Sequence, residues 1–495
     1  MSNTGTDQPS WPLAAVVEYL GVASEILDRT GDLVISGICH DSRLVQPGDI
    51  YAALPGARHH GGEFVAEAVA RGAVAVMSDR PTEIAPTVVV DNPRKALGPL
   101  ASWIHGRPSS MLDVYGVTGT NGKTSTAFML EAGLRAAGKR TGLVSGVCVR
   151  GPEGSRQARR TTPEAGELQT TLAGFVRDRV EGVAMEVSSH GLAQHRIDGT
   201  YFHVAAFTNL ARDHLDFHRT MAEYFEVKAR LFTDELCAAA VVGVDDPYGR
   251  ALAARIRVPT LSVSSRGRPA DVVATAIRTD RNGTDFTLHH EHWVRRIRLR
   301  MLGSYQVDNA LTAFASLRLG GVDMAAAIDG IEDLNAVPGR LERVDLGQDY
   351  LAFVDYVHNP AAQHRLFPYL RTLTSNRLIV VLGATGGRDP GKRKPLGRIA
   401  GSFADIVIVT DEGPFDDDAA RLRDDVAAGA REAQHATVLV VPDRGEALAI
   451  AVAQAQKGDT VLVAGRGHDH VMNYDGVEVP FHDRRALERA MIEHA

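Results

Sequence analysis

Short apolar runs rich in β-branched residues alternate with longer amphipathic stretches along most of the chain. The last third holds five such runs, each followed by enough residues for a helix. Because none of the five alternates apolar with polar positions, they are typical of strands buried on both faces of a parallel sheet. The runs are "LAFVDYV", "RLIVVLGAT", "DIVIVTDE", "TVLVVPD" and "DTVLVAGRG". They predict an α/β domain at the C-terminal end.

Polar residues stand where these predicted strands end. Open parallel sheets bind ligands at the carboxyl ends of their strands, so this edge is the predicted binding edge. The middle of the chain behaves likewise, because "VAMEVSSHG" carries Glu186 and "HVAAFTNLARDH" ends in residues 209–214. In the last third the end residues are Asp355, Thr385, Asp411, Asp443 and Arg466.

The chain is too long for a single hydrophobic core, because 495 residues usually form several domains. Gly106 and Pro108 interrupt it just before the strand "LDVYGVT", and Pro338 with Gly339 follows an alanine-rich helical stretch. We therefore expect three α/β domains, at residues 1–108, 109–336 and 337–495.

Composition and charge narrow the function. The net charge of −7 implies no basic surface, so we expect no nucleic-acid partner. Cys39, Cys148 and Cys237 form no CxxC pair, which disfavours a disulfide framework or a thiolate metal site. No stretch approaches the roughly 18 apolar residues of a membrane helix, and "MSNTGTDQPSWPL" lacks a signal-peptide pattern. We expect a cytoplasmic protein without membrane insertion.

The stretch "VTGTNGKTST" predicts a phosphate-binding loop. A glycine-rich turn between a strand and a helix directs backbone N–H groups at an anion, while Lys123 offers a cation and Thr124 a hydroxyl for Mg²⁺. The strict Walker pattern has glycine where this chain has Val117. An ordinary turn with a surface lysine is the simpler alternative, and the GKT triplet between strand and helix disfavours it.

Two residues at predicted strand ends could reach the same metal. Glu186 and His214 each follow a buried run, although either residue alone more often makes an ordinary hydrogen bond there. His214 and His218 are four residues apart, but no glutamate follows as in HExxH, so a zinc protease is not predicted.

Seven motifs in this order resemble the ATP-dependent Mur ligases, and within that family the MurE type. They are "GVTGTNGKTST", "TTPEAGEL", "MEVSSHGLAQHRIDG", "FTNLARDHLDFH", "EYFEVKARLF", "VPGRLERV" and "VDYVHNP". The resemblance spans nearly the whole chain and includes "HDSRLVQPGDIYAALPG" near its start. The family loop itself reads TGTNGK[ST], so Val117 is no departure from it.

The resemblance implies an N-terminal uridine-binding domain, a central ATP-binding domain with a mainly parallel sheet, and a Rossmann-like C-terminal domain. The last would bind the incoming amino acid and close over ATP. The implied reaction belongs to peptidoglycan synthesis. The D-glutamyl γ-carboxylate of UDP-N-acetylmuramoyl-L-alanyl-D-glutamate attacks ATP, and the amine of a diamino acid then displaces phosphate from the acyl phosphate. We expect a monomer.

The resemblance also assigns residues to the ATP site. Mg²⁺ would be held by Thr124, Glu186, His214 and a carbamate that Lys228 forms with CO₂, although the sequence alone places a helical lysine in solvent. Gln306 and Val357 are mild departures from the family pattern. The residues expected to act on ATP are Lys123, Glu186, His214, Lys228, Arg340 and Asp355, with contacts from Gly119, Thr120, Asn121, Gly122, Thr124, Ser125, Asn309, His358 and Asn359.

A second group of matching residues is expected to bind the nucleotide-sugar peptide. Ser42, between Asp41 and Arg43, is the expected uracil contact, and Arg196 offers a charged fork to a carboxylate or phosphate. The group consists of Ser42, Thr161, Thr162, Ser188, Gln194 and Arg196.

The acceptor is the open question. Relatives that take meso-diaminopimelate carry DNPR after the strand that reads "DIVIVT" here, but this chain has "DEGPFDDD", with Phe415 at the arginine position. Because that arginine would bind the distal carboxylate, and the acidic run beginning at Glu412 suits a bare ammonium, we expect L-lysine, with L-ornithine next. Asp469 replaces a glutamate of the diaminopimelate enzymes and is counted, with Glu412, among the acceptor residues.

Three alternatives stay open. Meso-diaminopimelate would require another cation, such as Arg388 or Arg466. The chain could instead be a related ligase with a different acceptor, or an ATPase without ligase activity. A DNPR sequence does occur early, at residues 91–94, where we expect it to be coincidental.

Overall fold

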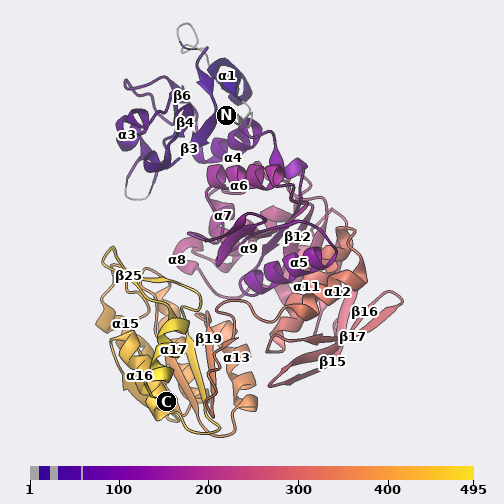
Figure 1. The fold of residues 1–495 in the computed structure, drawn as a ribbon, viewed down its shortest axis with the longest axis vertical. Coiled ribbons are helices and arrows are strands. Elements are labelled where there is room, and N and C mark those ends of the chain that lie inside the picture. The colour runs from indigo at the N-terminus through magenta and orange to yellow at the C-terminus, as the bar shows by residue number, and fades with distance from the viewer. Residues whose placement is uncertain (1–9, 23–29, 31, 57–58, 495) are drawn as a thin grey trace, which may run out of the picture.

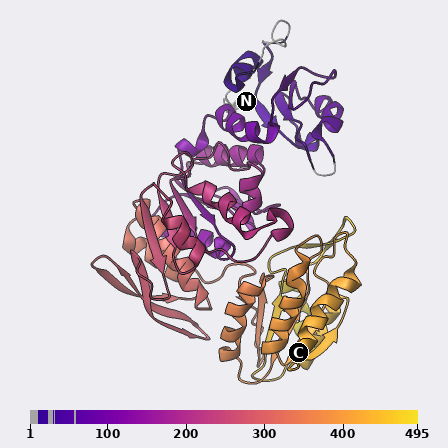
Figure 2. The ribbon, with the colours of Figure 1, turned by 180° about the vertical axis from the view of Figure 1, so that it is seen from behind.

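The computed structural model describes residues 10–22, 30, 32–56 and 59–494, so most of the stretch inspected for a signal peptide lies outside the described residues. Three main sheets, of four, eleven and six strands, follow one another along the chain. The part with the eleven-stranded sheet lies between the other two (Figures 1 and 2). The predicted three-domain α/β fold is therefore confirmed, while boundaries at 108 and 336 stay predictions.

The N-terminal sheet is parallel, in the order β3-β4-β5-β6. Its elements are β3 (Gly37–Cys39), β4 (Asp49–Ala52), β5 (Ala75–Ser78) and β6 (Thr87–Val89), with helices α1 (Leu13–Leu20), α3 (Val65–Ala70) and α4 (Pro93–Ile104), and a short pair β1 (Trp11–Pro12) and β2 (Val34–Ile35). The early DNPR is the start of α4, because Asn92 accepts from the Lys95 N–H at 3.1 Å and Pro93 is the first helical residue.

The middle sheet has a parallel centre and antiparallel edges, in the order β10-β9-β8-β11-β7-β12-β13-β14-β15-β16-β17. Strands from β8 to β15 in that order pair in parallel. The strands are β7 (Asp113–Thr118), β8 (Thr141–Val144), β9 (Cys148–Gly151), β10 (Gly154–Gln157), β11 (Gly182–Glu186), β12 (Val204–Phe207), β13 (Ala240–Gly243), β14 (Thr260–Ser264), β15 (Val272–Asp280), β16 (Gly283–His290) and β17 (Trp293–Leu299).

Helices cover both faces of this sheet. Successive residues of β7 point to opposite sides, so Tyr115 packs in one core and Val114 in the other. The first core includes α5 (Lys123–Ala136), α11 (Tyr305–Leu319) and α12 (Met324–Asp333), and the second α6 (Ala165–Arg177), α7 (Ser189–Ala193) and α9 (Met221–Ala229). Short helices α8 (Leu215–His218) and α10 (Pro247–Ala253) lie in the connections. Burial of α5 fixes its first turn at the sheet edge.

The C-terminal sheet has the order β18-β19-β23-β20-β21-β22 and is parallel except for β18. Its strands are β18 (Glu342–Arg343), β19 (Leu351–Asp355), β20 (Leu378–Leu382), β21 (Ile406–Val409), β22 (Thr437–Val440) and β23 (Thr460–Ala464), and a hairpin β24 (Val471–Tyr474) and β25 (Val477–Pro480) stands apart. Helices α13 (Pro360–Leu373), α14 (Arg393–Phe403) and α15 (Ala419–Glu432) pack in one core, and α16 (Arg444–Gln454) and α17 (Asp483–Glu493) in the other.

All five apolar runs of the last third form strands of this sheet, as predicted. One detail is wrong, because β22 is the outer strand and leaves Thr437 and Val440 exposed. The antiparallel edges of the middle sheet were not predicted either. Strand β16 shows the alternating burial of a half-exposed strand, a pattern that parallel core strands lack.

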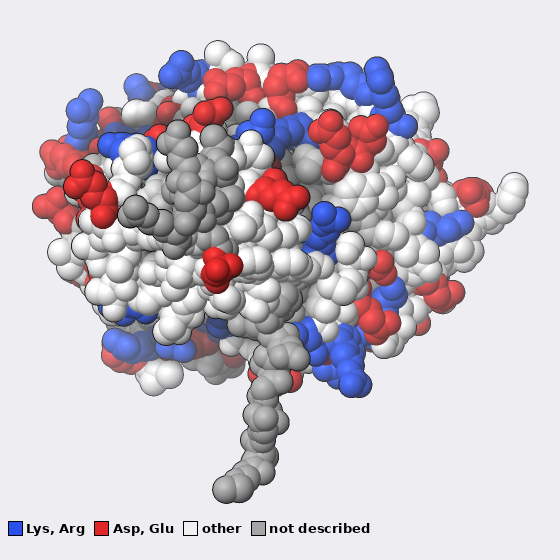
Figure 3. Space-filling model, turned by 90° about the horizontal axis from the view of Figure 1, so that it is seen from above, with Lys and Arg blue, Asp and Glu red and all other residues white. Residues whose placement is uncertain are grey.

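Basic and acidic side chains are interspersed on the face of the molecule seen in Figure 3. Among the described helices, none combines the length and the apolar character that crossing a membrane requires.

Candidate active site at the edge of the middle sheet

The predicted phosphate loop connects β7 to α5 at the carboxyl edge of the middle sheet. Gly119 and Gly122 have φ values of +145° and +90°, which residues with a Cβ rarely adopt. A Cβ on Gly122 would also lie 2.2 Å from the side-chain oxygen of Asn309. The loop therefore requires both glycines, and it leads into a helix start whose free N–H groups favour an anion.

Lys123, Thr124 and Glu186 lie together at this edge. The Lys123 ammonium donates to two carbonyl oxygens of its own loop, at 3.0 and 2.9 Å. The Thr124 hydroxyl donates to one oxygen of Glu186 at 3.0 Å, and the other oxygen accepts from the Gly146 N–H at 2.8 Å. A hydroxyl beside a carboxylate offers the hard oxygen ligands that Mg²⁺ prefers, so these residues fit that ion.

Lys228 lies beneath the loop and is only 1% exposed. Its amine donates to the Gly119 carbonyl at 2.9 Å and contacts the Thr118 hydroxyl at 3.3 Å. Burial, reinforced by the charge of Lys123, lowers the pKa of Lys228 well below its usual range. The expectation of a solvent-exposed helical lysine is wrong, because α9 turns this side chain against the loop. A neutral amine there fits carbamate formation.

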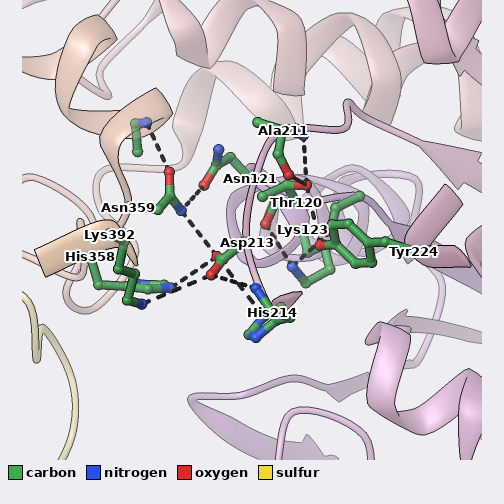
Figure 4. Close-up of polar contacts among 12 residues, drawn as sticks. Thr120, Asn121, Lys123, Ala211, Asp213, His214, Tyr224, His358, Asn359 and Lys392 are labelled. Atoms are coloured by element: carbon green, nitrogen blue, oxygen red, sulfur yellow. Dashed lines mark hydrogen bonds and ion pairs between the residues drawn. The ribbon is translucent and has the colours of Figure 1, made fainter. Parts of the chain in front are cut away.

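The carboxylate of Asp213 connects this edge to the C-terminal domain (Figure 4). It is 4% exposed and accepts from the His214 N–H at 3.0 Å and the Asn359 amide at 3.3 Å. The His358 imidazole lies 3.4 Å away and the Lys392 ammonium 3.9 Å. Burial alone would raise the pKa of Asp213, but the hydrogen bond from His358 and the neighbouring charges hold it well below its usual range.

His214 follows Asp213 and has a positive φ of 55°. Its ring centroid lies 4.8 Å from that of His190. Burial lowers the pKa of His214 to about 2. The imidazole is therefore neutral at pH 7, the form in which its ring nitrogen can bind a metal.

Two further side chains of the C-terminal domain reach the loop. Arg340 donates to the Thr124 hydroxyl at 2.9 Å, and its guanidinium lies over the ring of Tyr356, 4.6 Å from the centroid. Asn359 donates to the side-chain oxygen of Asn121 at 3.0 Å and also caps helix α13. The facing edges of the two sheets therefore share one set of polar contacts.

Asp355 supports these residues from behind. Its buried carboxylate accepts from the backbone N–H groups of Leu341 and Val357, at 2.5 and 2.7 Å. Burial raises the pKa of Asp355 above its ordinary value. Because Leu341 directly follows Arg340 and Val357 directly precedes His358, the Asp355 carboxylate helps to position both residues.

Other residues of the phosphate loop are buried or hydrogen-bonded to neighbouring segments of the middle domain. The Thr120 hydroxyl donates to the Ala211 carbonyl at 3.2 Å, and Ser125 is 3% exposed. Asn309 donates to the side-chain oxygen of Gln306 at 2.8 Å. The departure at position 306 thus supplies a hydrogen-bond acceptor and leaves the buried pair satisfied.

Most residues expected to bind the nucleotide-sugar peptide gather around the short helix α7, with Ser188 before its first residue and Gln194 and Arg196 after its last. Thr162 donates to the Glu186 carbonyl at 3.0 Å and accepts from the Ser188 N–H at 2.9 Å. Arg196 donates to the Gln194 side chain at 2.5 Å. Thr161 stands next in the chain to Thr162, and its hydroxyl would lie 3.2 Å from a Cβ on Gly146.

The structure does not bring Ser42 to this cluster. Ser42 lies in the N-terminal domain and donates to Glu67 at 2.7 Å. The two domains are joined instead through Glu164, whose carboxylate pairs with Arg196 at 3.1 Å and with Arg94 at 3.3 Å. Arg94 of the early DNPR therefore serves a junction between domains.

The acidic run at residues 412–418, which was expected to receive the ammonium group of the acceptor, already makes hydrogen bonds and ion pairs within the protein. Glu412 is 4% exposed and accepts from the Gly383 N–H at 3.2 Å and the Thr385 hydroxyl at 3.0 Å. Asp417 pairs with Arg393 at 2.6 Å, and Asp418 caps helix α15. The reason given for preferring lysine is weakened, because three of these carboxylates are bonded within their own domain.

Cations also lie beside this run. Arg466 is 5% exposed and donates to the Glu412 carbonyl at 2.9 Å, with one nitrogen 3.3 Å from the Cβ position of Gly413. Asp469 lies 3.8 Å from Arg466. Phe415 is 40% exposed and has a φ of 52°, so its ring fills no buried acceptor pocket.

Sequence reasoning missed two partners at the centre of the site. Asp213 stands inside the quoted motif "FTNLARDHLDFH", but no periodicity shows that it would face another domain. Lys392 ends a short 3-10 helix (Pro390–Lys392) directly before α14, belongs to no motif and is only 8% exposed. Among the described residues, no three His, Cys, Asp or Glu side chains gather as a ready metal site.

Three family profiles match the chain. They are described as "Mur ligase family, catalytic domain" over residues 34–102, "Mur ligase middle domain" over residues 117–317, and "Mur ligase, glutamate ligase domain" over residues 339–467.

Similar proteins span the full length. A UDP-N-acetylmuramoyl-L-alanyl-D-glutamate--2,6-diaminopimelate ligase of Streptomyces coelicolor is 43% identical over 491 residues, covering 97% of this chain and 96% of that protein. The ligase of the same name from Corynebacterium glutamicum is 40% identical over 482 residues, covering 94% and 93%. A solved structure of a ligase of this name has a TM-score of 0.67 at 28% identity, covering 96% of this chain and 98% of the other.

Removal of the Asp213 carboxylate should loosen the contact between the two domains. In Asp213→Ala the nearly buried Lys392 would lack its counter-charge, a change that typically costs about 3–5 kcal/mol. We expect amide hydrogen exchange in residues 118–124 and 356–364 to accelerate at least about tenfold. The matched control is Arg212→Ala, which removes the 3.2 Å pair between a 60% exposed arginine and Asp389 and should change exchange far less. Equal exchange in both variants would contradict the role of Asp213.

Proposed function

The chain belongs to the Mur ligase family, and from this premise we propose that it joins 2,6-diaminopimelate to the D-glutamyl γ-carboxylate of UDP-N-acetylmuramoyl-L-alanyl-D-glutamate, at the expense of ATP. The observation that carries the proposal is the meeting of two sheet edges. Lys123, Thr124 and Glu186 stand on one edge, and Arg340 of the next domain contacts the Thr124 hydroxyl. A nucleotide site on one domain thus faces an acceptor site on another.

The loop residues would stabilise charge during phosphoryl transfer. The substrate γ-carboxylate attacks the γ-phosphate of ATP, so that a C–O–P bond forms while the bond to ADP breaks. Lys123 would leave its loop carbonyls for the β- and γ-phosphates, and Arg340 would approach from the other domain. The acceptor amine then attacks the acyl carbon, and phosphate departs with the former carboxylate oxygen.

The oxygen ligands beside the loop fit Mg²⁺. Thr124 and Glu186 would hold it, and His214, neutral at pH 7, would help to place a second ion. When bound, the ions supply positive charge that offsets the phosphate oxygens. The chain itself orients the hydroxyl, because Glu186 fixes it from one side and Arg340 from the other.

Lys228 would contribute as a carbamate. The uncharged form of its amine attacks CO₂, a C–N bond forms and one proton leaves the nitrogen, so an uncharged group becomes an anion able to bind Mg²⁺. The low pKa that burial and Lys123 impose supports this step, because an ammonium has no lone pair to attack with.

The relatives favour 2,6-diaminopimelate over lysine, which was the preferred expectation from the sequence. The structure supplies a physical reason to revise that preference. Glu412 and Asp417 are bonded within the C-terminal domain. Arg466 lies beside Gly413, where it donates to the Glu412 carbonyl, and an exposed Arg388 lies in the loop after β20. Either cation could meet the distal carboxylate that Phe415 cannot bind.

The remaining assignments follow the same proposal. Thr161, Thr162, Ser188, Gln194 and Arg196 would bind the peptide side of the nucleotide sugar, and Ser42 the uracil. Boundaries near residues 108 and 336 would separate the three domains. That the enzyme acts as a monomer in the cytoplasm stays a prediction.

A product assay tests the reaction and the acceptor together. With the nucleotide-sugar dipeptide, ATP and Mg²⁺, and equal lysine, ornithine and 2,6-diaminopimelate, we expect mass spectrometry to detect the diaminopimelate adduct at least about tenfold above the others. Lys123→Ala, which removes one charge contact to the phosphates, should lower turnover by at least about a hundredfold. A dominant lysine adduct would refute the acceptor, and ATP hydrolysis without any adduct would refute the ligase.

Carbamylation of Lys228 predicts a specific rescue. Lys228→Ala should lose activity because the anion is absent, and added formate or acetate should restore part of it by occupying the vacated space. Lys139→Ala, which removes a partly exposed lysine from the same domain, is the control and should keep normal activity without any effect of carboxylates. Full activity of Lys228→Ala in carboxylate-free buffer would eliminate the carbamate.

A further inference from the structure

A cavity of about 390 Å³ lies between the middle and C-terminal domains, on the side of the outer strand β10. The middle domain contributes Phe128 of helix α5 and residues of the β9 and β10 hairpin. The C-terminal domain contributes His468, His470 and His482, and Pro338 lies at the connection between the domains. Ligand pockets commonly have about this volume and such a position between domains.

The polar walls of the cavity offer hydrogen-bond donors. Arg150 and Arg156 line it together with the three histidines, and no aspartate or glutamate of the described part of the chain does. The Nε and Nη2 atoms of Arg150 each donate to a carboxylate oxygen of Glu131. Its third nitrogen, Nη1, has no hydrogen-bond partner among the described residues. Arg156 pairs with Glu167 at 3.2 Å, and its side chain is 49% exposed. An exposed pair of this kind is weak, so Arg156 can turn to a ligand at little cost.

The histidines can also donate hydrogen bonds to a ligand. The rings of His470 and His482 meet edge to face, 4.6 Å between centroids, and the Nδ1 atom of His482 is buried without a hydrogen-bond partner among the described residues. A neutral imidazole still carries one N–H donor, so these rings can add to the two guanidinium groups.

The cavity is distinct from the sites of the proposed reaction. Asp469, which stands between His468 and His470 in the chain, does not line it and lies 3.8 Å from Arg466 instead. The phosphate-loop residues do not line it either. The walls are nevertheless linked to the active site, because the His468 imidazole contacts the Gly146 carbonyl at 3.2 Å and the Gly146 N–H holds Glu186.

We propose that this cavity is a second binding site, which takes a small oxyanion bearing a phosphate or carboxylate group. Arg150, Arg156 and His470 bind the anion, and the ligand bridges the hairpin of the middle domain to the loop that carries Asp469. Neither ATP nor the acceptor occupies this site.

The thiol of Cys148 provides a local probe, because it lines the cavity and is partly accessible. We would measure alkylation of Cys148 by neutral iodoacetamide on the full chain, with the phosphate loop filled by a non-hydrolysable ATP analogue and Mg²⁺. Inorganic phosphate and malonate are titrated in separate arms to distinguish the two chemistries. Cys39 of the N-terminal domain, equally partly accessible, is the internal reference.

At least one anion should slow Cys148 alkylation saturably, by about fivefold or more, while the Cys39 rate stays constant. Arg156→Gln should weaken that protection by about tenfold, because a charged hydrogen bond is lost. Arg296→Gln is the matched control, since Arg296 sits on the opposite edge strand β17, is 78% exposed and pairs with Asp285 at 3.5 Å. In Arg296→Gln the anion should protect Cys148 from alkylation as strongly as it does in the native chain. Absence of saturable protection by both anions, or equal protection in Arg156→Gln, would overturn the proposal.

Discussion

The Asp213 carboxylate holds together the two sheet edges on which the site depends. A buried anion is stable only when its partners come close, and here Asn359, His358 and Lys392 all come from the other domain. The same contacts bring Arg340 to the Thr124 hydroxyl. The Asp213 carboxylate therefore helps to fix the phosphate loop relative to the acceptor domain, together with the Arg340–Thr124 and Asn359–Asn121 contacts.

Crowding of positive groups is the second physical feature of this edge. Lys123, Lys228 and Arg340 lie near one another, and burial with mutual repulsion lowers the pKa of both lysines. Such an arrangement is unfavourable unless a polyanion offsets it, which is what a triphosphate would do. Burial and the charge of Lys123 also lower the pKa of Lys228, so the proposed carbamate and the proposed phosphate contacts of Lys123 both involve this crowding.

The sequence predicted what depends on local pattern. Parallel strands appeared as apolar runs, and the phosphate loop was visible because Gly119 and Gly122 are required by its backbone. Contacts between domains could not be predicted. Asp213 and Lys392 lie far apart in the sequence, in different domains, and no helical or strand periodicity connects them. The relatives support the alternative, 2,6-diaminopimelate, better than lysine. The argument for lysine came from a run of acidic residues, and the sequence does not show that Glu412 and Asp417 are already bonded.

In the proposed reaction, the two facing sheet edges act on one substrate carboxylate through an acyl phosphate. The most direct measurement labels both oxygens of the D-glutamyl γ-carboxylate with ¹⁸O and follows the label by mass spectrometry after a single turnover. If the carboxylate oxygen attacks the γ-phosphate and departs with it, each released phosphate carries one ¹⁸O and the new amide retains the other. Released phosphate without ¹⁸O, alongside normal amide formation, would contradict the account.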